Sequence, residues 1–158
     1  MNLTEEYNEL RRSCARAYME HVRSARARAD ALRDEIDMER QSMGPKGMRF
    51  DRIGKSSPYA DAIPDGVARI DGMLSRYTEQ LREYMAEAEE AHDMLACLPD
   101  PRHAAVLTRR YVLGRSWCEV AADMGMAERS ARRLGESALL ELYQSLPAEW
   151  RVPCQPAV

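Results

Sequence analysis

A cluster of three arginines and one glutamate in the C-terminal third of the chain has side chains suited to reading DNA bases. A guanidinium can donate two parallel hydrogen bonds to O6 and N7 of guanine, and a carboxylate can accept one from the cytosine amino group. Arg132 or Arg133 would contact guanine, and Arg129 would contact guanine or phosphate. Glu128 would contact cytosine. The same cluster also fits a solvated helix face on which these arginines pair with Glu128 and Glu136, so the surrounding elements decide between the two interpretations.

Two short amphipathic segments joined by one glycine carry this cluster. Ser116 followed by Glu119 forms the capping box S-x-x-E, which begins a helix. Gly125 ends that helix, because a residue of positive φ is favoured at a helix C-terminus. The two expected apolar stripes are Trp117, Val120, Ala121 and Met124, then Ala131, Leu134, Ala138 and Leu142. This plan, with Met126 filling the corner, is that of a helix-turn-helix, and it favours base reading over a solvated face.

The segment from about Leu98 to Leu146 resembles region 4 of sigma factors. It contains the pattern L-x-x-R-Y ending at Tyr111, the run SWCEVA from Ser116, and A-L-x-x-L ending at Leu142. The whole chain, with long helices in front of this segment, resembles small phage-encoded transcriptional regulators of the ArpU/RinA type. The resemblance implies a DNA-binding regulator in the cytoplasm of a bacterial host cell.

The resemblance also implies which residues contact DNA, since base contacts in the family come from the first two turns of the second helix. The corresponding positions are Glu128, Arg129, Ser130, Arg132 and Arg133. Two residues depart from the family pattern. Ala127 stands where a Ser or Thr cap is usual, which costs about 1 kcal/mol. Gly135 lies inside the second helix, at a further cost of about 1 kcal/mol relative to alanine.

Further arginines ahead of the second helix are candidates for phosphate contacts that fix the register without reading sequence. They are Arg102, Arg109, Arg110 and Arg115. The formal net charge of the chain is −3, so affinity for DNA has to come from the local distribution of charge.

Catalysis and metal binding have no support in the sequence. His21, His92 and His103 are isolated, whereas zinc ligands recur at short fixed spacings. Glycine motifs for phosphates, dinucleotides and serine nucleophiles are absent. We therefore expect no enzymatic activity, no metal and no cofactor. The four cysteines lack a C-x-x-C pair and are typical of reduced cytosolic thiols: Cys14, Cys97, Cys118 and Cys154. No long apolar run predicts a membrane segment.

Two long helices are predicted ahead of residue 98. The first spans about 4–41, a region without proline or glycine, and the second begins between 59 and 65 and continues to Leu98. Apolar residues recur in both at alternating spacings of four and three, as in coiled coils, with one slip near Tyr18. The expected stripe of the first helix is Leu3, Tyr7, Leu10, Cys14, Tyr18, Val22, Ala25, Ala29, Leu32 and Ile36.

Opposite charges predict that these helices pair in an antiparallel hairpin. Residues 11–33 contain seven arginines and two acidic residues, and residues 71–93 contain seven acidic residues and two arginines. Folding the chain back would place Arg11 near Asp93 and Arg33 near Asp71. Each exposed pair contributes only a few tenths of a kcal/mol, but like-signed pairings are penalised. A two-helix hairpin buries little core, so a homodimer through its remaining faces is expected.

The connecting segments complete the predicted organisation. The glycine- and proline-rich stretch 43–58 is basic and forms either a solvated loop or a contact with DNA or a partner. Leu98-Pro99-Asp100-Pro101 is expected to be a hinge, followed by a helix over 102–113 that Gly114 closes. Val106, Leu107 and Tyr111 of that helix should pack against Trp117 and Leu134. The tail after Leu146 shows little pattern, and we expect it to be frayed, with Trp150 docked back on the domain.

We therefore expect an all-α protein with a long antiparallel coiled-coil hairpin over 1–98 (loop about 43–60), a sigma-region-4-like helix-turn-helix over 99–146, and a tail over 147–158. The expected function is sequence-specific regulation of transcription, of the phage or prophage late-gene activator type, on double-stranded DNA and with a possible contact to RNA polymerase. Two alternatives remain open. One is a phage small terminase subunit, which packages DNA and assembles into a ring. The other is a sigma-like adaptor that binds RNA polymerase without DNA.

Overall fold

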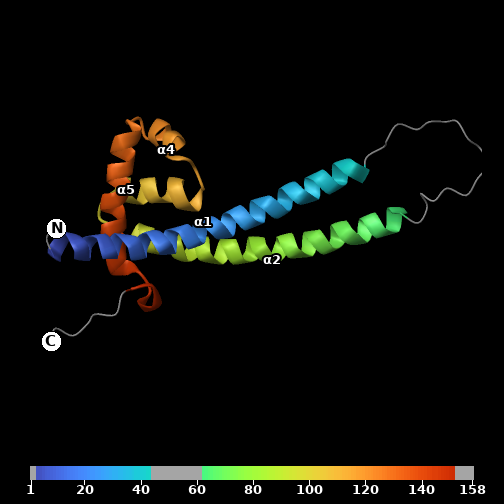
Figure 1. Ribbon diagram of the computed structural model, residues 1–158, viewed down its shortest axis with the longest axis horizontal. Helices are drawn as coiled ribbons and strands as arrows, with labels where there is room; N and C mark the ends of the chain where they lie inside the picture. The colour runs from blue at the N-terminus through green and yellow to red at the C-terminus, as the bar shows by residue number, and fades with distance from the viewer. Residues whose placement is uncertain (1–2, 44–61, 152–158) are drawn as a thin grey trace, which may run out of the picture. The chain divides into compact units, whose positions relative to one another are not determined.

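The computed structural model describes residues 3–43 and 62–151 and confirms the all-α class, since the described residues form helices and turns only. Two of the α-helices in the described residues are long and three are short, and Figure 1 traces them in colour along the chain. Their order is α1 (Leu3–Met43), α2 (Ala62–Ala96), α3 (Pro101–Leu107), a π-helical turn (Thr108–Val112), α4 (Trp117–Asp123), α5 (Glu128–Leu142) and the 3-10 turns Tyr143–Ser145 and Ala148–Trp150. The basic loop expected over 43–58 lies, from residue 44 on, outside the described residues.

Contacts between residues divide the chain into two compact units. The larger unit comprises Met1–Ala27 and Tyr84–Val158, and the smaller unit comprises Arg28–Glu83. This division cuts through both long helices and does not follow the boundary expected near residue 98. The segment after residue 98 shares its core with the first part of α1 and the last part of α2. A few short helices alone bury too little apolar surface to be stable.

The core of the larger unit draws side chains from all five helices. Trp117 and Leu134 pack against the core cluster that includes Val106, Leu107 and Tyr111, in agreement with the expectation from the sequence. The buried set is Ala15, Tyr18, Met19, Val22, Ala88, Ala91, Leu95, Leu98, Val106, Leu107, Tyr111, Val112, Val120, Ala121, Ala131, Ala138, Leu139, Leu142, Tyr143 and Leu146.

The buried face of α1 differs from the predicted stripe. Leu3, Tyr7 and Leu10 were expected in the seam, yet their exposed fractions are 82%, 43% and 44%. Ala15 and Met19 lie beside that stripe and are completely buried. The reason is that α1 packs against two neighbours at once in this unit. His21 lies 3.1 Å from Glu87 of α2, and another face of α1 meets α5, which crosses it in Figure 1.

The predicted single helix over 102–113 is a shorter α-helix continued by a π-helical turn. Asp100 caps its start by accepting a 2.8 Å hydrogen bond from the Arg102 backbone N–H, and Gly114 ends the segment at φ 69°. Val106 and Leu107 are buried, and so are the two residues five positions later, Tyr111 and Val112. The π-helical turn has i→i+5 hydrogen bonds and is wider than an α-helical turn of 3.6 residues, so it brings residues five positions apart closer to one face than an α-helix would.

In the smaller unit, residues 28–43 of α1 lie antiparallel to residues 62–83 of α2. Arg28 donates to Gln80 at 3.2 Å, and Arg69 donates to Glu39 at 2.9 Å. The expected pairs of Arg11 with Asp93 and of Arg33 with Asp71 are wrong. Arg33 pairs with Asp30 and Asp34, and the Arg11 guanidinium stacks 4.1 Å from the ring centre of Tyr7. Arg33 thus finds its partners within α1, whereas Arg11 stacks on Tyr7 of α1 and also lies 5.5 Å from the ring centre of Tyr143, which follows α5.

The chain beyond α5 turns back onto the larger unit. Trp150 packs edge-on against Tyr18 of α1, with ring centres 5.5 Å apart, so the expected docking of this tryptophan is confirmed. Arg151 donates from Nε to the Leu146 carbonyl at 2.6 Å and closes the turn.

Candidate nucleic-acid interface

The α4–turn–α5 segment has the local geometry that the sequence predicts. The Ser116 hydroxyl accepts a hydrogen bond from the Glu119 backbone N–H at 3.3 Å. The Glu119 carboxylate accepts one from the Ser116 backbone N–H at 2.8 Å, which completes the capping box. Gly125 has φ 63° and ends α4. Ala127 begins α5 without a side-chain cap.

One face of α5 is buried in the core and the opposite face is exposed. The buried residues are Ala131, Gly135, Ala138, Leu139 and Leu142. The five candidate base-contacting residues are all exposed in the first two turns: Glu128, Arg129, Ser130, Arg132 and Arg133. The helix therefore brings the whole predicted set to one exposed end of one element.

Within that set, Arg132 differs from the other two arginines. Its Nε and Nη2 donate to Glu128 Oε1 at 2.9 and 2.6 Å, so its charge is paired on its own helix. Among the described residues, the guanidiniums of Arg129 and Arg133 form no hydrogen bond or ion pair. These two lie four residues apart and therefore on the same side of α5, where they are the cations available to an incoming anion.

The Trp117 ring contacts two of the candidate arginines. The guanidinium carbons of Arg110 and Arg132 lie 5.2 and 5.5 Å from its ring centre, within cation–π distance. The ring also packs closely against the Gly135 backbone. Trp117 thus positions the side of α5 that carries Arg132.

The candidate phosphate-contacting arginines form hydrogen bonds or ion pairs with groups of the protein itself. Arg115 Nη1 lies 3.0 Å and Arg109 Nε 3.9 Å from the same Asp123 carboxylate oxygen. Arg102 pairs with Asp100 at 3.5 Å at the start of α3. Arg110 donates to the Arg115 carbonyl at 2.8 Å. A phosphate would have to compete with these partners.

Burial and the nearby charge of Arg23 lower the pKa of Arg110, although an arginine stays protonated at neutral pH. Its Nε is buried without a hydrogen-bond partner. Arg110 therefore forms part of the packing around Trp117 rather than a free cationic side chain.

Arg16 of α1 contacts α5, which the sequence did not predict. Its Nη2 donates to Glu136 of α5 at 2.7 Å. Burial acts to lower the pKa of Arg16, but the hydrogen bond and charge of Glu136 outweigh it and raise the pKa. No local signal links residues 120 positions apart, so only the fold reveals that α1 anchors the middle of α5.

The described part of the chain contains no group of three or more His, Cys, Asp or Glu side chains placed to hold a metal ion. None of its helices has the length and apolar character needed to cross a bilayer. Comparisons with family models, with curated proteins and with solved structures find no match to this chain.

Proposed function

We propose that the protein is a sequence-specific DNA-binding regulator of transcription that inserts the N-terminal half of α5 into a major groove. One observation carries the proposal. Arg129 and Arg133 lie one turn apart on the exposed face of α5, without intramolecular partners among the described residues, while the opposite face of the helix is fixed in the core. Unpaired guanidiniums on a rigidly held helix are suited to bidentate contacts with guanine.

The neighbouring residues would have supporting roles. Ser130 is exposed beside the two arginines and can bond to a base edge or a phosphate. Arg132 is held by Glu128 and by the Trp117 ring, so it contributes to base reading only after exchanging the carboxylate for DNA. Arg129 and Arg133 are therefore the primary contacts in this proposal.

The resemblance to ArpU/RinA-type regulators and to sigma region 4 supports a phage or prophage late-gene activator as the biological setting. In that setting the protein acts as a homodimer, so that two copies of α5 read two half-sites, and it contacts RNA polymerase through its long helices. Two-fold proteins read two-fold operators in this way.

A second candidate function is that of an adaptor that binds RNA polymerase without DNA. The pairing of Arg109 and Arg115 with Asp123, and of Arg102 with Asp100, favours it. An interface that uses phosphate contacts would normally keep such arginines available.

Fluorescence anisotropy with labelled duplexes from the neighbourhood of the protein's own gene tests the proposal. We expect saturable binding that weakens steeply with salt. Arg129→Ala/Arg133→Ala should reduce affinity at least about tenfold, since each bidentate contact is worth about 1–3 kcal/mol. Arg132→Ala should have a smaller effect.

The control is Arg40→Ala, which removes an exposed arginine from the smaller unit. If the wild type does not discriminate between genomic and scrambled duplexes, or if Arg40→Ala weakens binding as much as the α5 double variant, the proposal is wrong and the adaptor function takes its place.

A further inference from the structure

The described part of the smaller unit, residues 28–43 and 62–83, has little core for two well-formed helices. Its described buried apolar side chains are Ala29, Ile36 and Met73. The other apolar residues along the facing sides of α1 and α2 are only half-buried: Leu32, Ile70, Leu74, Tyr77 and Leu81. A pair of helices that leaves its own seam half-exposed lacks the third or fourth helix that normally covers such a surface.

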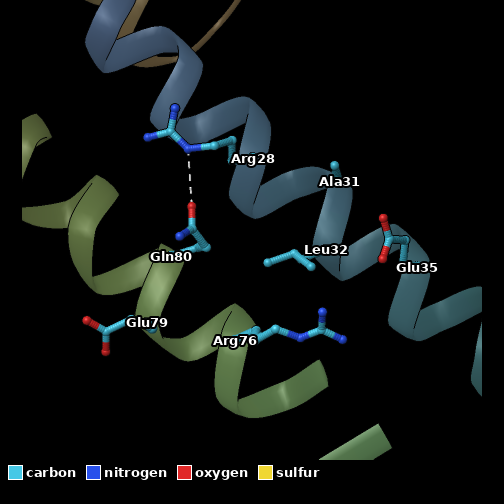
Figure 2. A pocket seen from close by; sticks show the side chains of 7 residues that line it. All are labelled: Arg28, Ala31, Leu32, Glu35, Arg76, Glu79 and Gln80. Atoms are coloured by element: carbon cyan, nitrogen blue, oxygen red, sulfur yellow. Dashed lines mark hydrogen bonds between the residues drawn. The ribbon is translucent and has the colours of Figure 1, made fainter. Parts of the chain in front are cut away.

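An open groove runs along this incomplete seam. Figure 2 shows Leu32 pointing between the two helices, with Arg28 and Glu35 along α1 and Arg76 and Glu79 along α2. The groove has a volume of about 420 Å³, and Ala31 is its other apolar lining residue. Apolar residues in the middle and charged residues at the margins are the usual features of an interface.

The charges at the margins are ordered in a way that identifies the partner. On α1, Arg28 and Glu35 are seven residues apart and lie on one face, with Ala31 and Leu32 midway between them. On α2, Arg76 and Glu79 lie on either side of Tyr77 and Thr78. Each helix therefore carries one cation and one anion on opposite sides of a central point. A two-fold rotation about an axis through that point, perpendicular to the helix, places the cation where the anion was and the anion where the cation was.

The two central points lie at the same level of the unit. Arg28 is paired with Gln80, and Glu39 with Arg69, so the middle of the α1 segment faces the part of α2 near Arg76 and Tyr77. A single two-fold axis can consequently pass through both centres. A surface of this kind is complementary to itself, as the interface of a two-fold dimer requires.

We propose that a second copy of this chain binds in the groove, with a two-fold axis at Ala31 and Leu32, so that the two smaller units form a four-helix bundle. The inference specifies the interface of the homodimer named under the proposed function and rests on that homodimer, but not on DNA binding. Across the axis, Arg28 of each copy faces Glu35 of the other, and Arg76 faces Glu79. Leu32 and the half-buried seam become the core.

The present contacts of these side chains permit the pairing. Arg28 uses Nε for Gln80, which leaves its terminal nitrogens for a carboxylate of the second copy. Glu79 bonds to Arg82 at 2.9 Å, but both side chains are more than half exposed, so that contact is weak and can be shared. Among the described residues, Glu35 and Arg76 form no hydrogen bond or ion pair.

Two charge-reversal variants of the full chain test the arrangement by analytical ultracentrifugation. Arg28→Glu/Arg76→Glu makes all four predicted contacts of its homodimer negative–negative, and Glu35→Arg/Glu79→Arg makes them positive–positive. Each variant alone should dimerise at least about tenfold more weakly than the wild type, because like charges face each other across the axis. An equimolar mixture restores four opposite-signed contacts and should recover the dimer.

The control Arg33→Glu/Arg40→Glu reverses two exposed arginines of α1 that do not line the groove. It should sediment as the wild type does. A monomeric wild type at micromolar concentration overturns both the homodimer and the groove interface. A dimer that survives both reversals, or a mixture that fails to recover, overturns the groove interface alone. Neither result bears on the DNA-binding experiment.

Disulfide trapping gives a measurement that does not depend on how the reversed variants fold. In a chain whose native cysteines are replaced by serine, Ala31→Cys places a thiol beside the axis, and mild oxidation should yield a covalent dimer. Asp34→Cys, at an exposed position outside the groove, should yield little. Equal cross-linking at the two positions would contradict the proposed axis.

Discussion

The tip of the Trp117 ring occupies the space that any side chain at Gly135 would need. A Cβ atom built at Gly135 would lie 2.6 Å from Cη2 and 3.3 Å from Cζ3 of Trp117. Contacts below 3.0 Å do not occur without a shift of one partner, so α4 and α5 approach each other this closely because residue 135 has no side chain. The glycine that weakens α5 as a helix is thus the residue that lets it pack.

Gly135→Ala should therefore destabilise the protein even though alanine is the better helix former. Overpacking costs about 1–3 kcal/mol, and the gain in helix propensity returns about 1 kcal/mol. We expect a net loss of about 1 kcal/mol in urea unfolding followed by circular dichroism.

The sign of this effect should reverse when the ring is removed. In a Trp117→Leu background, Gly135→Ala should become stabilising by up to about 1 kcal/mol. Gly72→Ala is the matched control in the wild-type chain, because a Cβ there meets nothing within 4 Å. If Gly135→Ala stabilises the wild type as much as Gly72→Ala does, the ring yields easily and the close packing has no role in stability.

Signals that act over one or two turns were sufficient to predict most of the helices. The capping residues Ser116 and Glu119 and the positive-φ residues Gly114 and Gly125 are where the sequence indicates, because caps and glycines determine structure through their immediate neighbours. The exposed position of the five candidate residues on α5 follows from the same local amphipathic pattern.

Most features that depend on distant contacts were not predictable. The packing of Trp117 on Gly135, the anchoring of α5 by Arg16 and the burial of Met19 all join segments remote in sequence. Charge counts predicted an antiparallel arrangement but not the partners of Arg11 and Arg33, because exposed ion pairs contribute too little energy to determine a register.

Acid should destabilise the protein through two helix caps. A hydrogen bond from the Arg102 backbone lowers the pKa of Asp100, and a hydrogen bond from the Ser116 hydroxyl lowers that of Glu119. Because both folded-state pKa values lie below those of the unfolded chain, these carboxylates stabilise the fold above the ordinary carboxyl range. That contribution is lost as the pH falls through the lowered values.

Asp100→Asn/Glu119→Gln should accordingly show a smaller fall in Tm between neutral and acidic pH than the wild type shows. Asp37→Asn/Glu89→Gln, which removes two exposed carboxylates away from the helix starts, serves as the control. Identical pH profiles for the wild type and the cap variant would show that other groups cause the acid sensitivity.

Tyr84→Phe should weaken the end of the π-helical turn. The carbonyl of Val112 accepts hydrogen bonds from the Tyr84 hydroxyl at 3.0 Å and from Arg26 at 3.2 Å. Removing the hydroxyl also removes the acceptor of a 3.4 Å hydrogen bond from Arg26, but the hydrogen bond from Arg26 to the Val112 carbonyl remains, so we expect a loss of about 1 kcal/mol in the free energy of unfolding. Tyr77→Phe, which changes a half-buried tyrosine of the smaller unit, should have little effect, and equal losses in the two variants would rule out a specific role for Tyr84.

Glu128→Gln distinguishes two roles of Glu128 in the proposed DNA binding, which are to restrain Arg132 and to contact a base directly. Glu128 holds Arg132 through two hydrogen bonds and compensates its charge. If that pairing restrains Arg132, the glutamine variant should bind DNA several-fold more tightly, with a salt slope steeper by about one released ion. The gain should disappear in Glu128→Gln/Arg132→Ala, since the effect acts through the arginine. Weaker binding by Glu128→Gln, confined to duplexes with a cytosine at one position, would instead show that the carboxylate itself reads a base.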